Sequence, residues 1–304
     1  MRKPDLSVNL NGLKMKNPIT VASGTFGFGK EYAEYFDLSK LGGIMVKGLT
    51  LEERQGNDAP RVAETPMGML NSVGLQNPGI DYFIKEELPY LKEFDTAIIA
   101  NINGTNLEEY CKIAEKASVD GVDSIELNIS CPNVKAGGLA FGTDPEMVYT
   151  VVDAVRGYTD KHLIVKLTPN VTDIKVIARA AEEAGADCLS MINTLSGMVI
   201  DIDSRKPILA RGIGGMSGPA VKPIAVRMVY EAAQVVDIPI IGMGGITYYE
   251  DAIEFMLAGA SAISVGTANF SNPVVTMEIL EGVLKYAEQY QLKSINELVG
   301  KINF

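Results

Sequence analysis

The feature that most constrains the fold is a regular alternation of short apolar runs with longer amphipathic segments. Eight runs are rich in β-branched or aliphatic residues: 19–23, 43–48, 96–102, 124–130, 163–168, 188–193, 239–244 and 262–267. Between them lie segments of helical periodicity, at 106–117, 144–158, 173–185, 219–236 and 248–259. Eight βα units predict an α/β fold, a (β/α)8 TIM barrel, with residues 1–304 forming a single domain.

The alternative is a doubly wound open sheet. That fold favours a GxGxxG turn after its first strand, and the glycines of 23–32, SGTFGFGKEY, have the wrong spacing.

Three additions to a minimal barrel are expected. Residues 6–18 alternate around Asn11-Gly12 and predict a hairpin that closes the N-terminal mouth. Inserts at Thr50–Ile80 and Leu195–Gly218 follow strands, so they belong on the face where the strands end.

Charge and cysteine content exclude several classes of function. The formal net charge is −11, which repels nucleic acid and anionic lipid surfaces. Three cysteines, at 111, 131 and 188, have no metal-ligand spacing, so we expect no metal site. No apolar segment follows the charged N-terminus, and polar residues interrupt the uncharged stretch 255–277. We therefore expect a cytoplasmic protein without a membrane span.

Polar residues occur where the predicted strands end, which is where a TIM barrel carries its active site. They are Ser23, Lys47, Asn101, Asn128, Lys166, Asn193 and Thr194. Both lysines directly follow apolar strand residues, where an unused charge would be costly. We interpret this set as one site.

Two further patterns indicate what this site binds. Gly244-Gly245 and Gly266-Thr267 offer unobstructed backbone N–H groups after the last two strands, the usual phosphate position in this architecture. Asn71, Asn128 and Asn193 both donate and accept, as a small planar ring with N–H and C=O groups requires. Lys47 could neutralise a carboxylate on that ring, and Lys166 could stabilise charge on a reduced cofactor.

Cys131 follows a strand and precedes a glycine-bearing loop, so it is the candidate reactive thiol, whereas Cys111 and Cys188 are expected to pack. The single histidine, His162, precedes the fifth strand and is expected as a surface residue at the opposite mouth. Histidine-assisted nucleophilic schemes are therefore disfavoured, and Cys131 is interpreted as a general base. Two alternatives stay open: a Schiff-base aldolase using Lys47 or Lys166, and a non-catalytic phosphate-binding barrel.

Motifs along nearly the whole chain carry a family resemblance. These are ASGTFGFGKEY, PMGMLNSVGLQNPG, IELNISCPNVKAGGLAFGTDPEMV, VKLTPN, MINTLSGM, SGPAVKPIAVRMVYE, PIIGMGGI and LAGASAISVGTANF. At these residues the sequence resembles the dihydroorotate dehydrogenases of pyrimidine (UMP) biosynthesis, and among them the class 1B catalytic subunits. The resemblance implies oxidation of (S)-dihydroorotate to orotate, with FMN as hydride acceptor and Cys131 as catalytic base.

The resemblance also implies the binding residues. FMN would be held by Ser23, Lys47, Gly48, Asn101, Asn128, Lys166, Ile192, Gly218, Gly244, Gly245, Gly266 and Thr267. Substrate would be held by Lys47, Asn71, Ser72, Val73, Gly74, Leu75, Asn128, Asn193 and Thr194.

For class 1B, the resemblance implies a partner subunit that carries FAD and a [2Fe–2S] cluster and passes electrons to NAD⁺. Three scattered cysteines agree with this, because the chain cannot itself supply four thiolates. A homodimer at the core of a heterotetramer is expected. A class 1A-like enzyme that uses fumarate is the alternative within the family.

Overall fold

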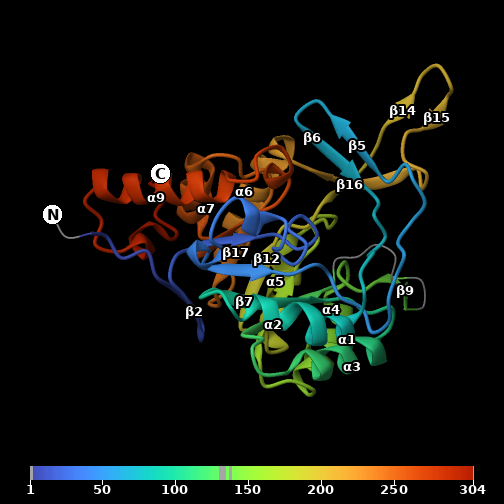
Figure 1. The fold of residues 1–304 in the computed structure, drawn as a ribbon, viewed down its shortest axis with the longest axis horizontal. Coiled ribbons are helices and arrows are strands. Elements are labelled where there is room, and N and C mark those ends of the chain that lie inside the picture. Colours follow the sequence, from blue (N-terminus) through green and yellow to red (C-terminus); the bar gives the residue numbers. More distant parts are fainter. Residues whose placement is uncertain (1–2, 130–134, 137–138, 304) are drawn as a thin grey trace.

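A closed barrel of eight parallel strands forms the centre of the molecule (Figure 1). The computed structural model describes residues 3–129, 135–136 and 139–303. In chain order the barrel strands are β3 (Ile19–Val21), β4 (Gly43–Met45), β7 (Ala97–Ile102), β8 (Ser124–Asn128), β11 (His162–Lys166), β12 (Cys188–Met191), β17 (Ile240–Met243) and β18 (Ala262–Val265). β18 pairs with β3 and closes the ring. The predicted TIM barrel is confirmed, with each strand inside or overlapping its apolar run.

Helices follow the strands along the outside of the barrel. They are α1 (Ile80–Tyr82), α2 (Leu88–Leu91), α3 (Leu107–Ala117), α4 (Pro145–Arg156), α5 (Ile174–Glu183), α6 (Lys222–Ala233), α7 (Tyr249–Ala258), α8 (Ala268–Ser271) and α9 (Val275–Gln289), with a π-helix η3 (Phe83–Glu87) between α1 and α2 and 3₁₀ turns η4 (Pro219–Val221) and η5 (Ile295–Leu298). Asn106, Asp144 and Asp173 cap α3, α4 and α5 with their side chains.

The first βα unit departs from the regular pattern. After β3 the described chain forms two 3₁₀ turns, η1 (Tyr32–Glu34) and η2 (Leu38–Lys40), and no α-helix before β4. This segment still packs against the barrel, because its side chains Phe26 and Leu38 are fully buried. The eight-fold βα pattern therefore holds for the strands but not for every helix.

The predicted N-terminal hairpin is present as β1 (Val8–Leu10) and β2 (Leu13–Met15), paired around Asn11-Gly12. The His162 side chain connects it to the barrel: one ring nitrogen lies 2.8 Å from Ser124 Oγ and the other contacts the carbonyl oxygen of Leu10. Burial lowers the pKa of His162. His162 lies at the start of β11, at the mouth opposite the strand ends, as predicted. The expectation of a surface residue is wrong, because the ring is half-buried and contacts both the hairpin and the barrel.

The two inserts meet and form a separate antiparallel sheet above the strand ends. The first insert supplies β5 (Val62–Thr65) and β6 (Gly68–Asn71), and the second supplies β13 (Leu195–Met198) and β16 (Ile213–Ser217), in the order β13-β16-β6-β5. We call this the roof sheet. A small hairpin, β14 (Ile200–Asp201) and β15 (Lys206–Pro207), projects from it, away from the barrel (Figure 1). The short pair β9 (Lys135–Ala136) and β10 (Leu139–Ala140) follows β8.

Neither a membrane span nor a metal cluster occurs in the part of the chain that the structure describes. Every helix within 3–129, 135–136 and 139–303 falls short of what a membrane-spanning segment requires. The same ranges contain no group of three or more His, Cys, Asp or Glu side chains that could hold a metal ion. Cys111 and Cys188 are both buried, as expected of packing residues.

Candidate active site

A cavity of about 1210 Å³ lies at the carboxyl ends of the barrel strands, under the roof sheet. That volume exceeds the roughly 300–1,000 Å³ of an ordinary ligand pocket, so it has room for a cofactor together with a substrate. Every predicted binding residue that the structure describes lines it: Ser23, Lys47, Gly48, Asn71, Ser72, Val73, Gly74, Leu75, Asn101, Asn128, Lys166, Ile192, Asn193, Thr194, Gly218, Gly244, Gly245, Gly266 and Thr267. Their individual roles stay predictions.

Cys131, the predicted base, lies outside the described residues. In the sequence it comes three positions after Asn128, the last residue of β8. Asn128 itself lines the cavity, and its carbonyl oxygen accepts a hydrogen bond from the buried Tyr110 hydroxyl at 2.9 Å. The end of β8 is therefore fixed against α3.

Lys166 brings a positive charge to the barrel end of the cavity. It is the last residue of β11, 4% exposed, and its ammonium donates to Ser23 Oγ at 3.2 Å. The Glu126 carboxylate lies 3.8 Å from Lys166 Nζ and is fully buried. The lysine is thus a buried cation with a partner, as the cost of burying an isolated charge requires.

Lys47 is the second cation of the cavity and follows β4. Burial lowers its pKa, and the nearby positive charge of Arg61 lowers it further. Arg61 lies on the first insert, where it donates to the carbonyl oxygen of Asn57 at 3.3 Å and to the side chain of Gln76. Lys47 lines the cavity, and a cation in the field of a second positive charge favours an anionic ligand beside it.

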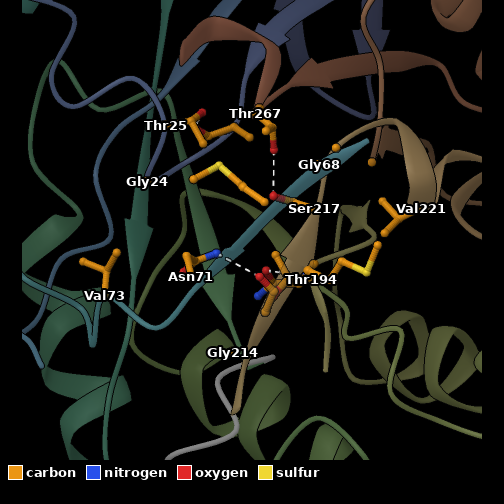
Figure 2. Close-up of a pocket in the computed structure, with 18 of the residues that line it drawn as sticks. Gly24, Thr25, Gly68, Asn71, Val73, Thr194, Gly214, Ser217, Val221 and Thr267 are labelled. Carbon is orange, nitrogen blue, oxygen red and sulfur yellow. Dashed lines mark hydrogen bonds between the residues drawn. The ribbon is translucent and has the colours of Figure 1, made fainter. Parts of the chain in front are cut away.

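The roof sheet contributes polar groups from above. Asn71 Nδ2 on β6 donates to the carbonyl oxygen of Gly215 on β16 at 3.3 Å, and the hydroxyls of Thr267 and Ser217 lie 2.7 Å apart (Figure 2). In Figure 2 the Asn71 side chain points toward Thr194, and Ser217 and Thr267 lie above this pair. Ser72 also lines the cavity, and its buried hydroxyl oxygen has no hydrogen-bond partner among the described residues.

The glycines after β17 and β18 form close backbone contacts. Gly245 has φ +78°, and a Cβ there would lie 2.8 Å from the carbonyl oxygen of Gly218 and 3.0 Å from the backbone nitrogen of Lys222. These residues bring the first turn of α6 against the end of β17. Backbone N–H groups without side chains are what a phosphate site at this position requires.

Sequence reasoning missed several residues of this site. Glu126 and Ser190 carry a signal that was available, since each alternates with apolar residues in its strand and so faces the barrel interior. Gly215 and Ser217 carry no such signal. They reach the cavity only because the two inserts pair with each other.

The chain is similar to known proteins along nearly its whole length. A family model described as Dihydroorotate dehydrogenase matches residues 5–286. The chain is 57% identical over 298 residues to the "Dihydroorotate dehydrogenase B (NAD(+)), catalytic subunit" of Thermoanaerobacter pseudethanolicus, covering 98% of this chain and 99% of the relative. It is 57% identical over 302 residues to the protein of that name from Alkaliphilus metalliredigens, with 99% and 100% covered. The protein of the same name from Bacteroides thetaiotaomicron is 56% identical over 299 residues, which cover 98% of this chain and 99% of the relative.

Proposed function

The chain belongs to the dihydroorotate dehydrogenase family, and on this premise we propose that it oxidises (S)-dihydroorotate to orotate in the cavity under the roof sheet. One observation carries the proposal. A set of polar residues and glycines, scattered from Ser23 to Thr267, converges on a single cavity large enough for a flavin and a small ring. Residues 1–304 act as one domain, and the reaction belongs to pyrimidine biosynthesis in the cytoplasm.

The flavin is FMN, and the donors of the cavity fit it. The phosphate would be held by residues that line the cavity after the last strands: Gly218, Gly244, Gly245, Gly266 and Thr267. The ring system would contact other lining residues: Ser23, Lys47, Gly48, Asn101, Asn128, Lys166 and Ile192. When bound, FMN supplies the hydride acceptor of the reaction.

The substrate ring is held by the amides and by Lys47. Asn71, Asn128 and Asn193, with Thr194 and the backbone of 72–75, supply donors and acceptors for the N–H and C=O groups of the ring. Lys47 and Arg61 provide the positive field for the substrate carboxylate. The half-buried position of Lys47 strengthens that attraction, since fewer waters screen it.

Cys131 is the general base. It removes a proton from one ring carbon, while the hydride leaves from the adjacent carbon. The proton thus ends on the thiolate and the electron pair leaves as hydride, so the ring gains a C=C bond. The family resemblance of the motif around Cys131 supports this assignment.

The electrons then leave the chain through a partner. The relatives are called catalytic subunits of NAD(+) enzymes, which supports a second subunit in this system. We assign to that partner FAD and a [2Fe–2S] cluster, because three cysteines in the whole sequence are too few for the four ligands of such a cluster. The assembly is a heterotetramer around a homodimer of this chain.

The experiment that tests this proposal compares electron acceptors. The purified chain should bleach its own flavin with dihydroorotate and reduce an artificial dye. NADH should appear only when the FAD and iron–sulfur subunit is added. If the isolated chain forms NADH as fast as it reduces the dye, the requirement for a partner subunit is refuted. Reduction of fumarate would indicate a class 1A-like enzyme. A purified protein without flavin absorbance would refute the proposed function.

A further inference from the structure

A chain of buried polar side chains runs through the barrel just below the cavity. Its centre is Glu126, in the middle of β8 and fully buried. Ser190 Oγ donates to Glu126 Oε1 at 2.7 Å, Asn101 Nδ2 donates to Oε2, and Lys166 Nζ lies 3.8 Å from Oε2. Two hydrogen-bond donors and one ammonium group, from the three other strands β12, β7 and β11, therefore converge on one carboxylate.

The carboxylate determines how these neighbours are oriented. An ionised carboxylate only accepts hydrogen bonds, so the Asn101 amide must turn its NH₂ group toward it. The carbonyl oxygen of Asn101 then points to the other side, where Asn103 Nδ2 donates to it at 2.9 Å. Lys166 is placed likewise, between Glu126 below and Ser23 Oγ at 3.2 Å.

Asn101 and Lys166 both line the cavity, whereas Glu126 does not. We propose that Glu126 is a positioning residue for the flavin: it fixes the Lys166 ammonium and the Asn101 amide as donors at the barrel end of the cavity. A buried carboxylate is costly unless its partners are well placed, so a role in stability alone gives little reason for it. This inference rests on the proposed function, because it names a further determinant of the same cofactor site.

A double-mutant cycle separates positioning from a purely structural role. FMN is removed from the full chain, and its rebinding is followed by quenching of FMN fluorescence, with titrations extended to millimolar FMN so that weak variants stay measurable. Glu126→Gln keeps the size of the side chain but replaces the acceptor-only carboxylate. We expect it to weaken FMN binding about tenfold or more when Lys166 is present. In a Lys166→Met background we expect less than a twofold further change, because the main group that Glu126 positions is gone.

Two more variants complete the design. Ser190→Ala removes one hydrogen bond to Glu126 and leaves both charges, so it should weaken FMN binding by about two- to fivefold, again only when Lys166 is present. It decides the question if Glu126→Gln does not fold. Thr20→Val is the matched control: Thr20 is equally buried in the barrel and bonds to the carbonyl oxygen of Ile263 at 2.9 Å, but it does not line the cavity. It should lower the melting temperature without changing FMN affinity.

The outcomes are distinct. Equal effects of Glu126→Gln with and without Lys166, unchanged or tighter FMN binding, or an equal loss in Thr20→Val would each overturn the inference. If the unmodified chain does not bind FMN at all, the proposed function fails first, and that result is visible before any variant is made.

Discussion

Replacing Gly245 by alanine tests whether the close packing after β17 is as tight as the structure describes. At φ +78° an L-residue costs about 1–2 kcal/mol in backbone strain. The added Cβ would also lie 2.8 Å from the Gly218 carbonyl oxygen and 3.0 Å from the Lys222 nitrogen, both backbone atoms that cannot rotate away. Overpacking of that kind costs about 1–3 kcal/mol. Together these effects lower the free energy of unfolding by about 2–5 kcal/mol.

The assay is thermal unfolding of the flavin-free chain, followed by circular dichroism. At about 2–4 °C per kcal/mol for larger domains, Gly245→Ala should melt roughly 4–20 °C lower than the unmodified chain. Gly266→Ala is the control. A Cβ there would meet Ala22 Cβ at 3.5 Å and Thr25 Cγ2 at 3.9 Å, which are ordinary contacts with residues of the cavity wall.

Gly266→Ala should therefore melt within about 2 °C of the unmodified chain while binding FMN about tenfold more weakly, because its methyl group takes space beside the proposed phosphate position. The two variants thus separate fold stability from cofactor binding. The reasoning is refuted if Gly245→Ala melts at the same temperature as the unmodified chain, or if Gly266→Ala is the less stable of the two.

Two further predictions concern the chemistry of the site. Cys131→Ala should keep FMN bound but slow flavin reduction by dihydroorotate about 10²–10⁴-fold in stopped flow, the usual contribution of a positioned base, and unchanged reduction at neutral pH would exclude Cys131. The lowered pKa of Lys47 means that its ammonium loses its proton at lower pH than an ordinary lysine with a pKa of 10.5, so orotate affinity should decline with rising pH from below that value. Lys47→Met should bind orotate weakly at every pH, and a pH dependence that survives in this variant would assign it to another group.

The barrel could be predicted from sequence because its signal is local. Each barrel strand is a short run buried on both sides, and the turn after it changes to helical periodicity. The first unit was the exception. Between β3 and β4, η1 and η2 replace the helix, and these two 3₁₀ turns are too short to leave a periodic pattern.

The roof sheet could not be predicted, because its pairing is not local. Residues 69–71 of β6 pair with residues 215–217 of β16, and nothing in either segment specifies the other. The same limit applies to Gly215 and Ser217, which join the cavity through that pairing. Glu126 is different, because it alternates with Ile125 and Leu127 in its strand. That alternation predicts a side chain that faces the barrel interior.

The pairing of β6 with β16 also bears on how the chain is made. During synthesis from the N-terminus, β5 and β6 emerge as a hairpin whose open edge has no partner until residue 217 has left the ribosome. An exposed strand edge is a template for association with other chains. Truncated or stalled products that end before β16 should therefore be prone to aggregation, and the cofactor can enter a finished cavity only after most of the chain has been released.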